Sequence, residues 1–298
     1  MKKILYFDAC SGVSGDMFVG ALIDAGACID AIRSHISALT VDGIEIQSHQ
    51  VSRGGIAATK FEVRDPRTGI AVDAPAARHV AGQVAARGHD HPHSNHHDHG
   101  RQQGQDADSH PAHRNQRGLK EIRSVIGNSR LPQAIKEDAL AVFERMARAE
   151  AKVHGVDPEQ VHFHEIGALD CIADIVAASS AFHQLGIDTA WCSAVHVGTG
   201  TVLCAHGVLP VPAPATLELL HGIPVYSSGI PGELATPTGV ALLKQFCKGF
   251  GPMPRLAVEK VGYGAGSREL SIPNLLRATV GYGGDPFFPK KGSGRAVS

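Results

Sequence analysis

The sequence predicts a mixed α/β (α+β) protein, in which mixed sheets pack with helices and a disordered histidine-rich insert interrupts the fold. Three observations lead to this prediction. An apolar run at Ile4–Phe7 precedes a glycine- and serine-rich turn and then a helical pattern, as in a strand–turn–helix unit. Several short segments alternate apolar and polar residues, as half-buried strands do. Residues 88–117 contain no large apolar side chain, so they cannot contribute to a core.

The domain organisation follows from length and from changes in composition. A chain of 298 residues can bury a sizeable core in two domains, or in one large domain with an insertion. We expect four segments: an N-terminal α/β part at 1–66, a low-complexity histidine-rich insert at 67–117, a helical and mixed α/β remainder at 118–282, and a flexible tail at 283–298.

Before the insert, the pattern predicts strands and helices that pack against one another. After the first strand, apolar residues from Met17 to Ala25 recur at helical spacing, and Gly26 ends that helix. The remaining elements expected here are a helix at 29–39, alternating strands at 44–47 and 61–64, and a turn at 52–56.

After the insert, the pattern is helical at first and then mixed. A helix is expected to begin after Gly167 and to run to Leu185. Further helices are expected at 119–126, 135–149, 217–220 and 240–246, and strands at 194–197, 198–202, 257–261 and 275–280. The glycine-rich segment at 262–266 is expected to be a loop.

Charge and composition exclude several classes of function. The formal net charge is −1 at pH 7, which favours neither nucleic acid nor an anionic membrane. Aromatic residues make up 5% of the chain, which argues against base-stacking platforms. The six cysteines form no CxxC pair, so free thiols in a reducing compartment are expected. No apolar run is long enough for a signal peptide or a membrane span, and we expect a cytoplasmic protein.

The polar turn at residues 8–16 is a candidate site for an anion or a metal. Asp8 stands at the carboxyl end of the first strand, where a carboxylate can hold a metal or a substrate hydroxyl. The turn then enters a helix, whose N-terminal amides suit a phosphate. The spacing matches neither a Walker A loop nor GxGxxG. A simpler explanation stays open, in which Ser14 caps the helix and the glycines permit a tight turn.

The segment 161–176, VHFHEIGALDCIADIV, concentrates side chains that can bind a metal. In an extended chain His162 and His164 point to the same face. Once the chain turns helical, Asp170 and Asp174 are four residues apart and share a face as well. Imidazoles and carboxylates that meet in this way can hold a divalent metal. Packing explains the same residues equally well, with the histidines at the edge of a core and Asp170 as a helix cap.

The insert carries a second group of candidate metal ligands. Eight of the eighteen histidines lie between residues 88 and 117. Clustered imidazoles favour Ni, Zn, Cu or Co over Mg and Ca. The histidines lie in mid-chain among Asp and Asn, unlike a purification tag. We therefore expect this segment to collect a transition metal without forming a defined catalytic site. The six proposed ligands are His89, His91, His93, His96, His97 and His99.

Six motifs, taken together and in order, resemble the nickel insertion proteins of nickel-pincer cofactor biosynthesis (the LarC family). They are FDACSGVSGDM, the histidine-rich insert, VHFHEIGALDCIADIV, HGVLPVPAPATLELL, ELATPTG and GYGAGSRELSIPNLLR, and they span nearly the whole chain. The resemblance implies a nickel-inserting cyclometallase of the lyase or chelatase class. It implies CTP-dependent insertion of nickel into pyridinium-3,5-bisthiocarboxylic acid mononucleotide, and a nickel-pincer cofactor used by lactate racemase.

The resemblance also implies partners. Complete family members continue into a carboxy-terminal domain associated with nucleotide binding and oligomerisation, whereas this sequence ends soon after the motif at 262–277. We expect a separate C-terminal half, joined by a translational frameshift in some members. We also expect CTP with Mg²⁺ or Mn²⁺ as cofactor, a homo-oligomer, and a downstream enzyme that uses the pincer cofactor. We expect no binding to nucleic acid or to a membrane.

Our hypothesis assigns roles to residues within this resemblance. The nickel ligands are His162, His164, Glu165, Asp170 and Asp174, and the candidates for the base that removes a ring proton are His164, Glu165 and Asp8. The phosphate end is lined by Ser11, Gly12, Ser14, Gly15 and Asp16, with Thr236 and Thr238 from a second polar turn ahead of a helix. Two alternatives stay open: a Mg-dependent nucleotide phosphotransferase or hydrolase, and a non-catalytic nickel storage protein or metallochaperone.

Overall fold

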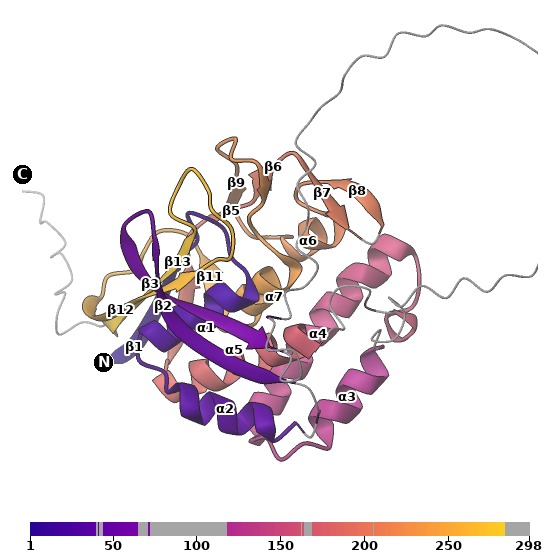
Figure 1. Ribbon diagram of the computed structural model, residues 1–298, viewed down its shortest axis with the longest axis horizontal. Helices are drawn as coiled ribbons and strands as arrows, with labels where there is room; N and C mark the ends of the chain where they lie inside the picture. The colour runs from indigo at the N-terminus through magenta and orange to yellow at the C-terminus, as the bar shows by residue number, and fades with distance from the viewer. Residues whose placement is uncertain are drawn as a thin grey trace, which may run out of the picture.

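The computed structural model describes residues 1–39, 41, 44–64, 71, 118–161, 163, 169–204 and 206–283. It confirms the predicted mixed α/β class, because helices pack with a mixed seven-stranded sheet (Figure 1). Apart from Ala71, the predicted insert at 67–117 lies outside the described residues, as does the tail beyond Gly283.

The central sheet has the strand order β11-β4-β1-β13-β12-β3-β2. Its strands are β1 (Lys2–Asp8), β2 (Glu45–Arg53), β3 (Ile56–Arg64), β4 (Thr189–Cys192), β11 (Cys247–Phe250), β12 (Ala257–Ala265) and β13 (Leu275–Gly283). Strand β1 lies in the interior of the sheet, antiparallel to β13 and parallel to β4. The four residues Ile4–Phe7 within β1 are buried, as their apolar run predicts. The N-terminal strand is therefore paired on both sides with strands from the second half of the chain.

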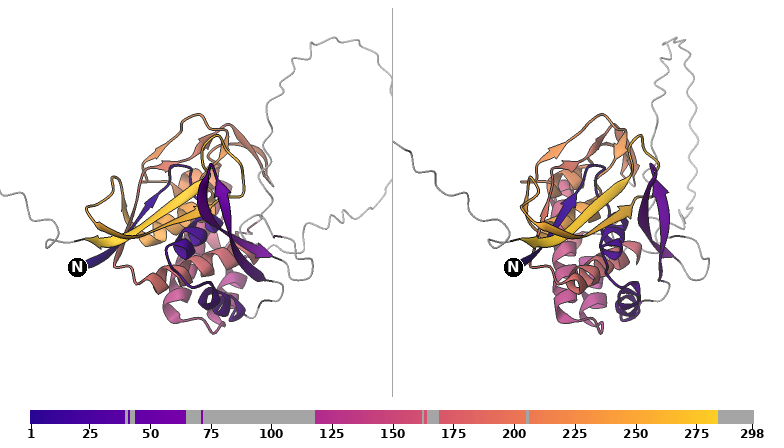
Figure 2. Two further views of the ribbon diagram at one scale, coloured as in Figure 1. Left: turned by 60° about the vertical axis from the view of Figure 1, so that its left-hand side comes forward. Right: turned by 90° about the vertical axis from the view of Figure 1, so that its left-hand side faces the viewer.

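The helices match the sequence periodicity closely. They are α1 (Gly15–Asp24), α2 (Ile29–Ser37), α3 (Leu119–Gly127), α4 (Gln133–His154), α5 (Leu169–Leu185), α6 (Pro214–Leu219) and α7 (Pro237–Phe246), with a short 3-10 turn at Pro158–Gln160. Helices α2 to α5 gather together below the long strands in both views of Figure 2. The longest helix, α4, ends at Gly155, whose φ of +66° lies in the left-handed region that glycine adopts without strain.

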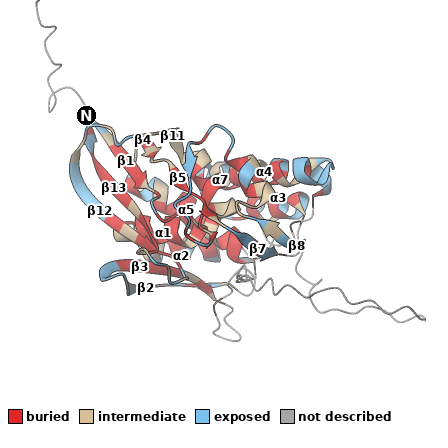
Figure 3. Ribbon diagram, turned by 90° about the horizontal axis from the view of Figure 1, so that it is seen from above, coloured by how far each residue is buried: buried red, intermediate tan, exposed pale blue. Residues whose placement is uncertain are grey.

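The main core fills the space between the sheet and the helices, and α1 lies in the middle of it (Figure 3). Phe18 of α1 is fully buried and its ring centre lies 4.6 Å from that of Phe7 in β1. On its other side α1 packs along α5, which is buried at nearly every position. Burying one such aromatic side chain contributes about 1.5–3 kcal/mol, so this layer holds α1 firmly in place.

The expectation of a loop at 262–266 is wrong, because Gly262 and Gly264 belong to strand β12. A Cβ at Gly264 would overlap the carbonyl oxygen of Met17, and one at Gly262 would overlap that of Ala21. The glycines thus let α1 lie directly on the backbone of the sheet. Glycine serves close packing here, whereas in sequence it is the usual sign of a turn.

Short strand pairs lie apart from the main sheet. They are β5 (Val195–His196) with β9 (Val225–Tyr226), β6 (Gly198–Thr199) with β10 (Gly232–Glu233), and β7 (Thr201–Cys204) with β8 (Gly207–Pro210). The single strand predicted at 198–202 is divided at Gly200, whose φ of +93° breaks the extended backbone. No helix in the described parts of the chain is long and apolar enough to cross a membrane.

Candidate functional site

The N-terminal ends of α1, α5 and α7 meet at one place, and this convergence defines the candidate site. A Cβ at Gly15 in α1 would overlap the Oδ2 atom of Asp174 in α5. In the first turn of α5, the Sγ atom of Cys171 lies 3.4 Å from the Oγ1 atom of Thr238 in α7. Three positive helix ends therefore point towards a shared region, which favours an anion there.

The two polar turns predicted to bind an anion run side by side. The amide of Val13 donates to the carbonyl of Leu234 at 2.9 Å, and the amide of Thr236 donates to the carbonyl of Val13 at 2.9 Å. Gly12 has a φ of +86°, and a Cβ at this position would overlap the carbonyl oxygen of Leu234. The sequence uses glycine here because no other residue permits both the backbone angle and the close approach.

The structure brings some predicted side chains to the convergence and gives others a structural task. Ser14, Asp174 and Thr238 are each partly exposed there, among buried neighbours. The Ser11 hydroxyl is buried and donates to the carbonyl of Pro273 at 2.6 Å. The Thr236 hydroxyl caps α7 by accepting from the amide of Gly239 at 3.2 Å. The Ser11 hydroxyl thus ties the first turn to Pro273, and the Thr236 hydroxyl caps α7.

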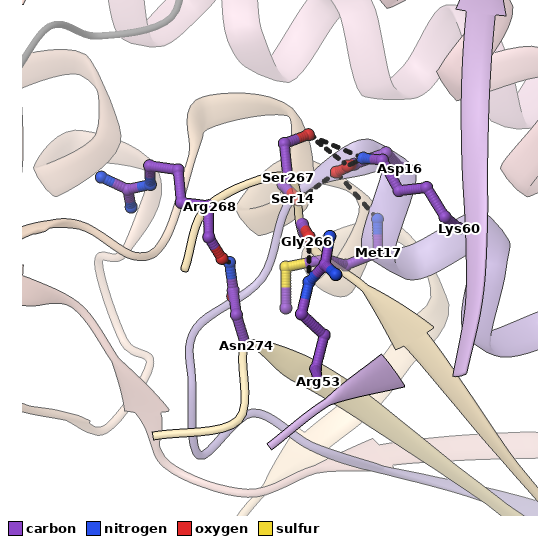
Figure 4. Close-up of polar contacts among 9 residues, drawn as sticks. All are labelled: Ser14, Asp16, Met17, Arg53, Lys60, Gly266, Ser267, Arg268 and Asn274. Atoms are coloured by element: carbon purple, nitrogen blue, oxygen red, sulfur yellow. Dashed lines mark hydrogen bonds and ion pairs between the residues drawn. The ribbon is translucent and has the colours of Figure 1, made fainter. Parts of the chain in front are cut away.

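Asp16 takes part in a buried ion pair that sequence analysis did not identify (Figure 4). Its Oδ2 atom accepts from the Nζ of Lys60 in β3, and its Oδ1 atom accepts from the Ser14 hydroxyl and, at 2.9 Å, from the amide of Met17. The Lys60 side chain is 7% exposed. Its ammonium also donates to the exposed Ser267 hydroxyl at 2.7 Å, so the charge pair lies directly under the surface. Lys60 falls in a strand, where its pattern resembles an ordinary solvent-facing position.

The loop from Gly266 to Asn274 covers this side of the site. Asn274 closes the loop by donating from its amide nitrogen to the Arg268 carbonyl at 2.9 Å, and Arg53 donates to the Gly266 carbonyl at 3.2 Å. The Arg268 guanidinium points away from Asp16 in Figure 4 and donates to the carbonyl of Glu233, the first residue of the second polar turn. Burial lowers the pKa of Arg268 from its ordinary value. The loop therefore brings a partly desolvated cation beside both polar turns.

Asp8 has a different set of partners. Its Oδ2 atom accepts from Arg277, which is its cross-strand neighbour in β13, and its Oδ1 atom accepts from the Cys10 thiol at 2.7 Å. Burial and then the hydrogen bond to Asp8 raise the pKa of Cys10 to about 11. Nearby, the buried His196 accepts from the amide of Gly198 at its Nδ1 atom, and burial lowers its pKa. This end of β1 is a network of paired groups.

The proposed nickel ligands are only partly described. Asp170 is buried in the first turn of α5, and Asp174 lies one turn further on against Gly15. Three of the proposed ligands, His162, His164 and Glu165, lie outside the described residues. The same is true of the insert ligands His89, His91, His93, His96, His97 and His99. Within the described part of the chain, no three His, Cys, Asp or Glu side chains gather closely enough to hold a metal ion.

Comparison of the sequence with known proteins identifies a family. Residues 5–295 match the family model described as nickel insertion protein. The chain is 43% identical over 279 residues to the pyridinium-3,5-bisthiocarboxylic acid mononucleotide nickel insertion protein of Desulfitobacterium hafniense (strain DSM 10664 / DCB-2). It is 41% identical to the proteins of the same name from Geobacillus kaustophilus and Thermotoga sp. (strain RQ2).

These alignments cover 94% of this chain but 58%, 60% and 61% of the respective relatives. The chain thus spans about three-fifths of the length of the curated relatives it matches. The comparison with solved structures finds no match.

Proposed function

The chain belongs to the nickel insertion protein family, and from this premise we propose that it inserts nickel into a pyridinium-3,5-bisthiocarboxylic acid mononucleotide. The names of the relatives from Desulfitobacterium, Geobacillus and Thermotoga contain this compound. The observation that carries the proposal is the convergence of the first turns of α1, α5 and α7 on a region that also holds carboxylates.

The helix ends supply what the phosphate of a mononucleotide needs. Backbone amides at the start of α1 and α7 carry partial positive charge, and the Thr238 hydroxyl can donate to a phosphate oxygen. Arg268 lies beside Glu233 at the start of the second polar turn, and its bidentate donors match a phosphate. Lys60 balances the charge of Asp16, so the turn does not repel an anion as strongly as its sequence suggests.

The carboxylates at the start of α5 supply a loose site for the incoming nickel ion. Oxygen ligands bind Ni²⁺ less tightly than sulfur does, so the two thiocarboxylate sulfurs of the substrate can take the ion over. We assign Asp170 and Asp174 to this task, together with His162, His164 and Glu165, which neighbour them in sequence. A base must also remove a ring proton when the nickel–carbon bond forms, and His164, Glu165 and Asp8 are the candidates.

Several finer points belong to the same proposal. We further propose that CTP with Mg²⁺ or Mn²⁺ takes part in the reaction, together with a separate C-terminal half. The product would serve lactate racemase or another pincer-dependent enzyme in the cytoplasm. We also propose that the protein forms a homo-oligomer.

The test is a mass-spectrometric assay for the nickel-containing product, run with the mononucleotide and Ni²⁺. CTP and the downstream half are each added or omitted. Product formation with Ni²⁺ supports the proposal. Nickel-independent turnover of a nucleotide with Mg²⁺ would instead support a phosphotransferase or hydrolase. Loss of all function when residues 89–113 are deleted, even at high nickel, would support a storage protein.

A matched pair of variants tests the site itself. Asp174→Asn keeps the shape of the side chain but removes its charge, and it should abolish nickel insertion. Asp188→Asn removes a carboxylate whose described partner is the amide of Lys3, at 2.7 Å, and it should leave insertion unchanged. Equal activity of the two variants would remove Asp174 from the proposed site.

A further inference from the structure

Two histidines that are distant in sequence meet on the surface, outside the site described above. His154 is the last residue of α4, and His206 lies at the turn between β7 and β8. Their ring centres are 4.8 Å apart and the ring planes are inclined by 40°. Both residues are exposed. Figure 1 shows the β7–β8 hairpin close to this end of α4.

The spacing of the two rings suits a shared metal ion. With a metal–nitrogen distance of about 2.1 Å, two imidazoles in neighbouring positions on one ion have ring centres roughly 4.5–5.5 Å apart. The observed separation of 4.8 Å falls within this range. Imidazole is a preferred ligand of Ni²⁺, Zn²⁺ and Cu²⁺ and a poor one for Mg²⁺ and Ca²⁺. The pair therefore selects the same class of ion as the histidine-rich insert.

A carboxylate supports one of the rings. The Oε2 atom of Glu150, one turn earlier in α4, lies 3.5 Å from the Nε2 atom of His154. A carboxylate beside one ring nitrogen fixes the ring and makes the other nitrogen a better ligand, as it does in many metal sites. Close by, Lys152 pairs with Glu218 at 2.6 Å, so α4 is also tied to α6. The helix end that carries His154 is thus held in position.

We propose that His154 and His206 form a surface site for a nickel ion, with Glu150 as the carboxylate that orients His154. No third ligand completes the set within the described residues, so water fills the remaining positions and the ion stays exchangeable. Such a site can receive nickel from solution or from a carrier before it passes to the substrate. The identity of the metal rests on the proposed function, whereas the ligand geometry does not.

The test follows each histidine separately in the full chain. Diethyl pyrocarbonate labels accessible imidazoles, and mass spectrometry locates each label. Nickel is added in steps beyond the capacity of the insert. Labelling of His154 and His206 should fall together, while His183 serves as the internal control. His183 is exposed and pairs with Asp138 at 2.7 Å. Unchanged labelling of His154 and His206 at saturating nickel would overturn the proposal.

Variants separate a metal site from a simple ring contact. His206→Ala should abolish the protection of His154 by nickel, whereas His183→Ala should leave it intact. Glu150→Gln should raise the nickel concentration that gives half-maximal protection about tenfold. Protection of His154 that survives His206→Ala would also overturn the proposal. The three histidines are exposed and Glu150 is partly exposed, and circular dichroism checks that each variant folds.

The outcome is distinguishable from that of the proposed function. A chain in which nickel protects both histidines but no product forms would contradict nickel insertion and leave the surface site in place. A chain that forms product while both histidines stay unprotected would contradict only the surface site.

Discussion

Two carboxylates bracket the same turn, and their surroundings differ. Asp8, where β1 ends, pairs with Arg277, whose side chain is 43% exposed. Asp16, where α1 begins, pairs with Lys60, whose side chain is 7% exposed. Both are charge pairs between segments distant in sequence. The carboxylates are similarly exposed, at 17% for Asp8 and 21% for Asp16, so the two pairs differ in the burial of the cation. This difference leads us to expect that burial of the cation, more than the identity of the charges, decides how much each ion pair contributes to the free energy of unfolding.

The largest expected effect is on the buried pair. Lys60→Met leaves Asp16 without its cation, and breaking a buried pair in this way costs about 3–5 kcal/mol of the free energy of unfolding. Adding Asp16→Leu should recover most of this loss, because an apolar pair of similar volume avoids an uncompensated charge. Urea denaturation of the three proteins measures both values. A double variant as unstable as Lys60→Met alone would contradict this account.

The second-largest effect is expected at the contact between α1 and α5, which holds the helix that carries Asp16. In Gly15→Ala the new methyl group overlaps Asp174 and must displace it, at a cost of about 1–3 kcal/mol. Nickel insertion should fall as well. The matched control is Gly127→Ala at the end of α3, where a Cβ meets no atom within 4 Å. This variant should be neutral or gain up to about 1 kcal/mol, because alanine restricts the unfolded chain.

The pair whose cation is exposed, Asp8 with Arg277, should respond weakly. Arg277→Gln removes the cation beside Asp8, and because solvent screens that pair the expected loss is about 0–1 kcal/mol. The measurement is the same urea titration that is used for Lys60→Met. If Arg277→Gln were as destabilising as Lys60→Met, burial of the cation could not be the factor that distinguishes the two pairs.

The smallest effect concerns the thiol next to Asp8. Because the pKa of Cys10 is raised to about 11, its alkylation by iodoacetamide should be slow at neutral pH and should speed up as the pH approaches that value. Asp8→Asn removes a negative charge that disfavours the thiolate. The pKa of Cys10 should then fall, though burial keeps it above the ordinary value, and alkylation at mildly alkaline pH should be faster. Exposed Cys28 is the internal control. An unchanged rate at Cys10 would show that Asp8 does not influence the thiol.

Much of the fold could be predicted because it depends on local patterns. Helical spacing located α1, α3 and α4, and the apolar run Ile4–Phe7 located strand β1. The failures lie where tertiary packing overrides a local preference. Gly262 and Gly264 look like a loop, but they form a strand because α1 lies on their backbone. Strands β8, β9 and β10 were not expected, because two to four residues are too few for a period to be recognised.

For the candidate site, the sequence located the two polar turns but not the function of each side chain within them. The hydroxyls of Ser11 and Thr236 form hydrogen bonds to the backbone, and their anion-binding role stays a prediction. Lys60 and Arg268 reach the site from other segments, and no spacing in the sequence connects them with it. The metal-binding roles of His162, His164 and Glu165 stay predictions, since these residues lie outside the described part of the chain.

By itself, the sequence determined the class of fold, the elements with clear periodicity, the family to which the motifs belong and the kinds of ligand its polar residues favour. These properties depend on residues that are close together along the chain. Only the tertiary structure decided that Asp16 faces Lys60, that Asp174 lies against Gly15, and that His154 meets His206. Each of these pairs joins segments that local patterns treat separately. They meet because burial of the shared core fixes where α1, α4 and α5 lie.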